Sequence, residues 1–552
     1  MADTKKQLRW YNVALIAFVS VWGLGNVFNN YAQQGLSVVT SWILIMLIYF
    51  VPYALIVGQL GSTFKDQAGG VSSWIKETGS VRLAYYAAWT YWVVHIPYLA
   101  QKPQAILIAL SWLFKGNGDF VNTVSSMTVS LICMELFLLF LWLSSRGLTT
   151  LNRIGSMAGT AMFLMSILFI ILAVTAPLMV KGVHVATPNM GDIHTYLPKF
   201  DLNYFTTISM LVFAVGGAEK ISPYVNNTKH ASKEFPLGML VLAGMVAFCA
   251  LLGSFGMGML FNSHHIPTDL MANGPYTAFA MLGKYYHVGG LFVILYSIAN
   301  ALASISALAF SIDAPLKILL SDADPHFIPK KLRRINRKGT PINGYWMTTI
   351  LCALIMALGA LLPKINDIFN WLLNLNGIVS PLSTCFLFWS YTMVRLHQDR
   401  FPTPDYTFLK NRKVGLVVGI WMLGITFLLG TLGFFPTDAT ADTFALMLGL
   451  NIVVPIGMVA LGVLMPWIAK RQRQADNGLA FSRNTWLVLT TLSLVGLVVA
   501  ATYGMHVNLL DHLTPVIQWP LIVIVDLAIA GVVLKVTANG RHQRVAGSPD
   551  EG

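Results

Sequence analysis

Charged residues are scarce in this chain. Only 11% of its 552 residues are Asp, Glu, Lys or Arg, whereas 56% are hydrophobic. An ordinary soluble domain carries about 25% charged residues. Together with a mean hydropathy of +0.65, this composition excludes a soluble globular domain and predicts an all-α polytopic membrane protein. The net charge of +13 does not indicate nucleic-acid binding, because the chain has no folded polar domain to carry a basic face.

Cysteine is also rare. The four cysteines fall inside apolar stretches and lack the spacing of metal ligands: Cys133, Cys249, Cys352 and Cys385. This pattern excludes a disulfide framework and gives no sign of a zinc site. We therefore expect neither a metal ion nor a cofactor.

Signatures of several other membrane protein classes are missing. The sequence contains no H-E-x-x-H motif and no Walker loop, which argues against a membrane metalloenzyme and an ATP-driven pump. Rings of repeated carbonyl or charged residues around a symmetric pore, which are typical of channels, are not visible. An enzyme and a channel remain less favoured alternatives to a secondary transporter.

Apolar stretches of about twenty residues, the length that crosses a bilayer, occur about fourteen times. The first contains Gly and Asn and lacks a small-residue cleavage site, so it predicts a span and not a signal peptide. The expected spans lie near residues 11–31, 42–61, 83–112, 124–144, 154–180, 204–225, 237–261, 290–318, 344–362, 368–394, 414–435, 444–468, 486–503 and 516–536.

The basic residues predict an orientation. Lys and Arg concentrate in alternate loops, and their strongest clusters lie at residues 330–338, 410–413 and 470–473. Cytoplasmic loops are enriched in Lys and Arg. This alternation therefore predicts that both termini are cytoplasmic.

Two glycine-punctuated segments interrupt otherwise apolar spans. Residues 22–26 (WGLGN) lie in the first span and residues 213–219 (FAVGGAE) in the sixth. Lipid cannot satisfy free backbone groups, so an unwound helix is tolerated there only where protein, water or a ligand supplies partners. Matched discontinuous helices indicate a transporter's binding site. Because the breaks are five spans apart, they also predict an inverted repeat and alternating access.

These breaks, the loop of residues 66–74 (DQAGGVSSW) and the basic loop of residues 325–341 resemble the amino acid–polyamine–organocation transporters. The likeness covers roughly residues 8–468. The chain is most similar to bacterial amino acid antiporters, including glutamate/GABA exchangers and precursor/amine exchangers. The resemblance implies a LeuT-like core with a 5+5 inverted repeat, followed by additional helices, two of them beyond the usual twelve.

The resemblance also divides the chain into parts. The expected parts are a cytoplasmic N-terminus (1–9), the ten-helix transport core (10–394), helices eleven and twelve (395–469), two accessory helices (470–538) and a cytoplasmic tail (539–552).

In this family, backbone amides of the first break bind the substrate carboxylate. Trp22, Gly23, Gly25 and Asn26 occupy that motif here. The physical expectation agrees, because the following half-helix presents N–H groups and the positive end of its dipole to an anion. The alternative is that the glycines only permit close helix packing. Two matched breaks favour the binding site.

The second break contributes further candidates by resemblance. Phe213 and Glu219 match the spacing of an aromatic gate and a glutamate in arginine/agmatine exchangers, and Gly216 and Gly217 lie between them. Tyr91 matches a site-lining position of the third span. We expect these residues to line the substrate site together with the first break.

Glu219 is the expected gating or proton-coupling residue. A carboxylate inside the membrane is costly, so it indicates a function by default. The alternative is a structural ion pair with Lys220 or with Lys102, which lies within the third span. Asp313, near the end of the eighth span, fits either gating or simple solvation.

We therefore expect a secondary transporter of amino acids, and more specifically an amino acid/amine exchanger. A proton-coupled symporter is the alternative. Glu219 favours a substrate with an amino group or a cationic end. The expected partners are a small amino acid or amine and the lipid bilayer of a bacterial inner membrane, without nucleic acid and with a homodimer as an option.

Overall fold

The computed structural model describes residues 8–67, 70–118, 124, 126–144, 148–200, 202–267, 270–320, 324, 326–335, 341–359, 365–435, 441–474 and 544–545. The structure there is helical, with one pair of two-residue strands. The helices are α1 (Trp10–Val21), α2 (Gly25–Gln34), η1 (Gly35–Ser37), α3 (Val38–Ile45), η2 (Met46–Phe50), α4 (Val51–Thr63), α5 (Val71–Thr78), α6 (Val81–Val93), α7 (Ile96–Lys115), α9 (Ser126–Ser144), α10 (Leu148–Met179), η3 (Ile193–Tyr196), α11 (Leu202–Ala214), η4 (Ala218–Asn227), α12 (Ala231–Leu260), α13 (Leu270–Tyr285), α14 (Leu291–Leu320), α15 (Ile342–Gly359), α16 (Ile365–Leu396), η5 (Gln398–Arg400), α17 (Arg412–Leu432), α18 (Ala441–Ala460), η6 (Leu461–Val463) and α19 (Leu464–Gln474).

The described helices support a multi-pass membrane protein. Seven helical segments are long and apolar enough to cross a bilayer, and three shorter apolar helices accompany them. Each of the first twelve predicted spans coincides with one helix or with a run of consecutive helices. The thirteenth and fourteenth spans lie outside the described residues, as does most of the predicted tail.

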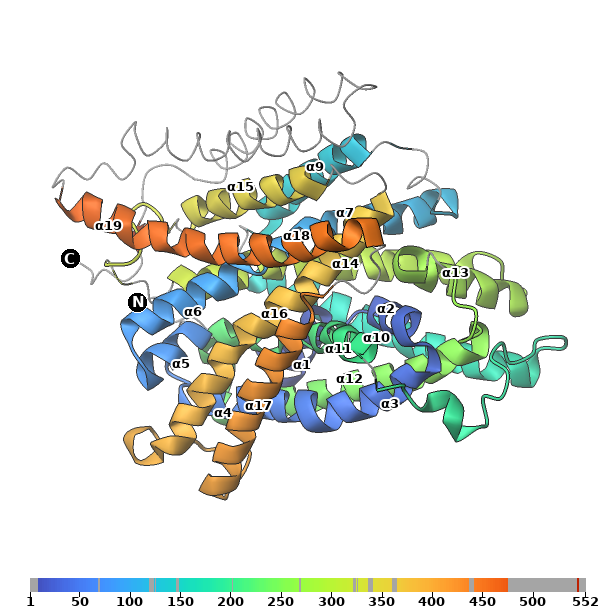
Figure 1. Ribbon diagram of the computed structural model, residues 1–552, viewed down its shortest axis with the longest axis horizontal. Helices are drawn as coiled ribbons and strands as arrows, with labels where there is room; N and C mark the ends of the chain where they lie inside the picture. The colour runs from blue at the N-terminus through green and yellow to red at the C-terminus, as the bar shows by residue number, and fades with distance from the viewer. Residues whose placement is uncertain are drawn as a thin grey trace.

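Both predicted helix breaks are present. The first span divides into α1 and α2 at residues 22–24, and the sixth divides into α11 and η4 at residues 215–217. Figure 1 shows α1, α2 and α11 in the middle of the bundle, with α3, α4 and α12 along one side and α7 and α14 along the other. The two interrupted spans are therefore central.

The third span contains a further discontinuity that the hydropathy pattern missed. Helix α6 ends at Val93, and α7 begins at Ile96 with Pro97 in its first turn. Proline fits the first turn of a helix because the N–H it lacks has no partner there. The span is thus two helices joined by a short turn.

The second span contains a π-helical turn, η2, directly before Pro52. Pro52 has no N–H to donate to the carbonyl of Ile48, four residues earlier. The indole Nε1 of Trp421 on α17 donates to that oxygen at 3.2 Å. In a membrane a free carbonyl is costly, so Trp421 compensates for the proline.

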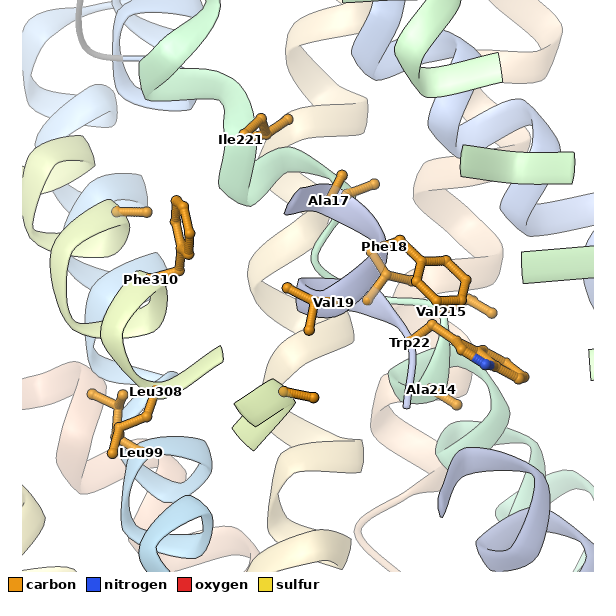
Figure 2. Close-up of a cluster of buried hydrophobic side chains, with 14 of the residues drawn as sticks. Ala17, Phe18, Val19, Trp22, Leu99, Ala214, Val215, Ile221, Leu308 and Phe310 are labelled. Atoms are coloured by element: carbon orange, nitrogen blue, oxygen red, sulfur yellow. The ribbon is translucent and has the colours of Figure 1, made fainter. Parts of the chain in front are cut away.

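Buried apolar side chains surround the breaks. Figure 2 shows Phe18 and Trp22, at the end of α1, beside Ala214 and Val215 of the second break. Trp22 is 2% exposed, and its ring centre lies 5.9 Å from that of Trp42 on α3. Packing around the unwound segments therefore excludes lipid from them.

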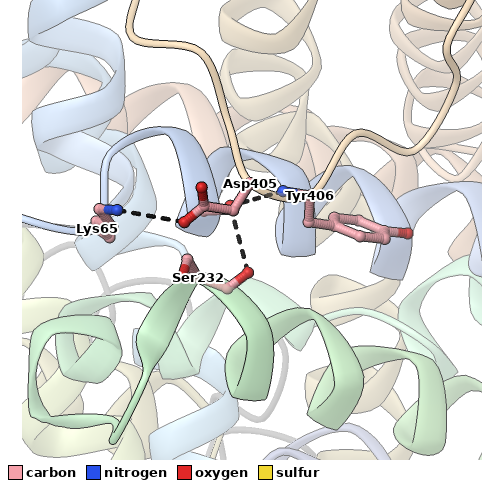
Figure 3. Close-up of polar contacts among 5 residues, drawn as sticks. Lys65, Ser232, Asp405 and Tyr406 are labelled. Atoms are coloured by element: carbon pink, nitrogen blue, oxygen red, sulfur yellow. Dashed lines mark hydrogen bonds and ion pairs between the residues drawn. The ribbon is translucent and has the colours of Figure 1, made fainter.

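Polar contacts fix the loop between η5 and α17. Asp405 accepts a hydrogen bond from Lys65 Nζ at 3.3 Å (Figure 3). The amide of Tyr406 donates to Ser62 Oγ at 3.2 Å. The pKa of the exposed Asp405 carboxyl lies below its ordinary value, because Ser232 and then Lys65 donate hydrogen bonds to it. These contacts therefore hold the loop against the end of α4 and the start of α12.

Backbone pairing brings together segments that are far apart in the sequence. Leu8 forms a parallel bridge with Thr228, directly after η4. Strand β1 (Arg334–Ile335) pairs antiparallel with β2 (Arg544–Val545). Residue 8 and the loop between the sixth and seventh spans thus lie on the same side of the bundle.

Candidate functional site

The first break exposes unpaired backbone amides. Trp22 is extended (φ −117°, ψ 135°), and the first amide of the next half-helix to bond backward is that of Asn26, to Gly23 O at 2.9 Å. The amides of Gly23, Leu24 and Gly25 donate to no group in the part of the chain that the structure describes. A side-chain carbon built on Gly23 or Gly25 meets no atom within 4 Å, so a ligand can approach these amides closely.

The second break depends on two glycines. The amide of Gly216 donates to Phe213 O at 2.9 Å. Gly217 has a φ of +99°, which an L side chain rarely adopts. Its amide donates to the Tyr53 hydroxyl at 3.3 Å. These bonds hold the unwound segment in place before η4 begins.

Asn26 joins the two breaks. Its Nδ2 donates to the carbonyl oxygen of Ala214 at 3.0 Å and to that of Val21 at 3.3 Å. Ala214 is the last residue of α11, and Val21 is the last residue of α1. Both acceptors are carbonyls that an interrupted helix leaves without a following amide. One side chain therefore satisfies both broken helices at the point where they meet.

A cavity of about 130 Å³ lies between the two breaks and helices α7, α13 and α14. Its volume is sufficient for several water molecules. The polar, charged and glycine residues of its lining are Ser20, Gly23, Gly25, Asn26, Asn29, Gln101, Lys102, Gly216, Lys220, Asn300, Ser304 and Ser380. Aromatic side chains complete the wall: Trp22, Tyr98, Phe213, Tyr276 and Tyr296.

Most of the candidate residues predicted from the sequence meet at this cavity. The residues of the first break, Trp22, Gly23, Gly25 and Asn26, line it together with Phe213 and Gly216 of the second. Their meeting is the geometric feature that the two sequence motifs predict.

Three predicted candidates are not among the lining residues: Tyr91, Gly217 and Glu219. Tyr91 is buried against His95, with ring centres 4.7 Å apart, and its carbonyl lies 2.5 Å from His95 Nδ1. Gly217 stands one residue beyond the lining and directly beside Lys220, whose Cε would lie 3.1 Å from a side-chain carbon added at Gly217.

Glu219 is 2% exposed, and its Oε2 has no hydrogen-bond partner among the described residues. The ion pairs found in the described part of the chain do not join Glu219 to Lys220 or to Lys102 within 4.0 Å. The structural ion pair with either lysine is therefore not formed in this structure. Glu219 remains a buried carboxylate one residue away from the cavity wall.

Lys220 and Lys102 were expected from the sequence only as partners for Glu219, whereas both lysines line the cavity. Lys220 Nζ lies 4.3 Å from the centre of the Tyr98 ring, and Lys102 Nζ lies 4.7 Å from the same centre. A lysine within an apolar span was the available signal. The sequence did not reveal that Lys102 on α7 and Lys220 on η4 both contact the ring of Tyr98.

The cavity lining is consequently electropositive. It contains two lysines, and none of its described residues is an Asp or Glu. Open backbone amides and the positive end of α2 add to the same sign of potential. The arrangement is suited to an anionic ligand.

Asp313 belongs to a separate buried network. Its carboxylate accepts hydrogen bonds from Tyr224 at 2.7 Å and Tyr345 at 3.1 Å, and Lys317 Nζ lies 2.8 Å away. Asp313 is 3% exposed, so simple solvation is excluded. The network links η4 to α14 and α15.

Comparison with known proteins decides the family. Residues 8–461 match the family model of the amino acid permeases, so the match covers most of the chain. The chain belongs to the amino acid permease family. Its members are membrane transporters, and the chain is accordingly a transporter and not an enzyme.

The curated relatives agree with this membership. The chain is 55% identical over 481 residues to the aspartate/glutamate permease AcaP of Lactococcus lactis, covering 86% of this chain and 98% of the relative. It is 22% identical to the inner membrane transporter YjeM of Escherichia coli over 77% of this chain and 89% of that protein. It is also 21% identical to a glutamate/gamma-aminobutyrate antiporter of Lactococcus lactis, over 57% of this chain and 61% of the antiporter.

Proposed function

We propose that this permease exchanges acidic amino acids across a bacterial inner membrane by alternating access. The observation that carries the proposal is the cavity between the breaks. Gly23 and Gly25, whose amides donate to no group among the described residues, line it together with two lysines. Free N–H groups at the start of a half-helix bind carboxylates. The named substrates of the relative at 55% identity, aspartate and glutamate, carry two carboxylates.

This proposal replaces the expectation of an amine substrate. That expectation rested on Glu219, which is not among the residues that line the cavity, whereas Lys220 beside it is. The two ammonium groups on the cavity wall repel a cationic ligand bound in the cavity. We therefore assign the substrate a net negative charge.

Alternating access is supported by the packing of matched spans. Under a 5+5 inverted repeat the second and third spans correspond to the seventh and eighth. Helix α4 of the second span packs on α12 of the seventh, and α7 of the third packs on α14 of the eighth. A two-fold axis through the central breaks would produce such pairing, and we retain residues 10–394 as the proposed transport core.

We further propose cytoplasmic termini. The bridge between Leu8 and Thr228 places the N-terminal segment on the same side as the loop after the sixth span, as an even number of spans requires. The clusters of Lys and Arg in the loops of that side favour the cytoplasm. A cysteine introduced at Ser263, between the seventh and eighth spans, should then react with an impermeant reagent in intact cells. Protection of that cysteine, with labelling of one introduced at Ser548, contradicts the orientation.

Proton-coupled symport is the second candidate, because Glu219 Oε2 is buried without a partner among the described residues. An unpaired intramembrane carboxylate is a common proton carrier. In this case protonation of Glu219 would accompany substrate entry.

Uptake of radiolabelled glutamate into proteoliposomes distinguishes these functions. Exchange predicts saturable uptake into vesicles preloaded with unlabelled glutamate and little uptake into empty ones. Symport predicts uptake into empty vesicles when an inward proton gradient is imposed. Absence of saturable uptake under both conditions, with folded protein in the membrane, contradicts the proposed function.

A further inference from the structure

We propose that Lys102 and Lys220 together bind the side-chain carboxylate of the substrate, with the Tyr98 ring as the surface between them. This inference rests on the proposed function and assigns the residues that separate acidic from neutral amino acids. The α-carboxylate binds at the first break, and the second carboxylate binds at the lysines on another wall of the same cavity.

The geometry brings both ammonium groups to one place. Lys220 Nζ and Lys102 Nζ lie 4.3 Å and 4.7 Å from the centre of the same ring, that of Tyr98. Both lysines therefore border the same ring, and a carboxylate at the edge of that ring is placed to contact both. Each ammonium gains a cation–π contact with the ring, which holds it near the cavity while no anion is bound.

The charges call for an anion. Lys220 is only 8% exposed, and neither Lys102 nor Lys220 has an acidic partner within 4.0 Å among the ion pairs of the described residues. Two like charges inside a membrane protein repel each other and are costly to desolvate. The buried Glu219 carboxylate is beyond ion-pair distance of both lysines, whereas a bound carboxylate supplies a counter-charge in contact with both at once.

Gly217 directs Lys220 toward Tyr98. A side-chain carbon at Gly217 would lie 3.1 Å from Lys220 Cε and 3.4 Å from its Nζ, so the lysine chain occupies the space that the glycine leaves open. The positive φ of Gly217 turns the chain into η4 at the same point. The second break thus aims a positive charge at the cavity.

The two lysines belong to different elements, α7 for Lys102 and η4 for Lys220. An anion that binds both draws these elements together and removes their repulsion. A neutral amino acid binds the first break equally well but does not bridge the lysines. The side-chain carboxylate therefore contributes to selectivity.

The test compares glutamate with glutamine, which has the same shape without the charge. In purified full-length protein, Lys220→Met and Lys102→Met should each lower the ratio of glutamate to glutamine affinity at least about tenfold, the effect of one lost charged contact. Lys115→Met is the matched control, because Lys115 is an exposed lysine at the end of the same α7. Lys220→Arg should retain most of the preference for glutamate.

The ratio of glutamate to glutamine affinity in the two methionine variants decides whether the inference holds. An unchanged glutamate-to-glutamine ratio in both methionine variants overturns the inference, as does an equal loss of both ligands. If Lys220→Met does not fold, Lys102→Met alone decides. If the wild-type protein binds neither amino acid, the proposed function fails instead, so the two failures are distinguishable.

Discussion

The side chain of Asn26 links the two interrupted helices by donating a 3.0 Å hydrogen bond to Ala214 O. The bond joins α2 to the last residue of α11, across 188 positions of the chain. Because both breaks share this contact, we expect a change in one break to be transmitted to the other. The substrate cavity lies beside that contact.

Replacement of Asn26 by alanine should destabilise the protein by about 1–3 kcal/mol, because it removes two hydrogen bonds and leaves two carbonyls without a donor. Exchange should fall strongly as well, since the breaks no longer move together. Thermal unfolding and proteoliposome exchange measure the two effects. Asn12→Ala is the control: it also removes two hydrogen bonds, from Asn12 Nδ2 to Ser156 Oγ on α10 and from the Arg9 amide to Asn12 Oδ1, and it should leave exchange near the wild-type rate.

Gly25→Leu should abolish glutamate binding while the protein remains folded. A side-chain carbon at Gly25 meets no atom within 4 Å, so the leucine enters open space in the cavity and covers the free amides. Isothermal titration measures the loss. The matched control is Gly424→Leu on α17, where the space is equally open. Near-native affinity in Gly25→Leu would indicate that the glycines of the first break serve only close helix packing.

Glu219→Gln should fold, exchange slowly and lose much of the pH dependence of exchange. The substitution removes the charge of a buried carboxylate and nearly preserves its shape, so any step that needs a protonation change at this residue is blocked. Exchange across a pH series, with variants reconstituted at equal density, is the measurement. An unaltered pH profile excludes the coupling role.

Asp405→Asn should lower the thermal stability slightly at neutral pH and have no effect in acid. The pKa of this carboxyl is below its ordinary value in the folded protein, through Ser232 and Lys65. Its stabilisation is therefore present above the unfolded pKa and is lost as the pH falls through the folded one. The exposed pair is weak. Unfolding of both proteins at neutral and acidic pH checks this; a difference that persists in acid contradicts it.

Much of the site was predictable because the breaks are encoded locally. Glycines inside an apolar span indicate where the helix unwinds, and the helices are interrupted at residues 22–24 and 215–217, within the two predicted segments. Depth in the membrane then places them near each other. For the same reason the sequence located six of the nine candidate residues on the cavity wall.

The sequence did not reveal whether Glu219 or Lys220 lines the cavity. Glu219 and Lys220 are adjacent, and on sequence grounds the carboxylate was the stronger candidate. The 3-10 helix η4 that follows the break sets the direction of both side chains, and it points Lys220 to the ring of Tyr98. That ring lies on α7, so only tertiary packing decides the sign of charge in the site.

A structure of the protein with bound glutamate tests the central claim most directly. One carboxylate should lie within hydrogen-bonding distance of the amides of Gly23, Leu24 and Gly25, and the other should lie beside Tyr98 within reach of Lys102 and Lys220. Glutamate bound outside this cavity, or with its amino group toward the lysines, would contradict the account.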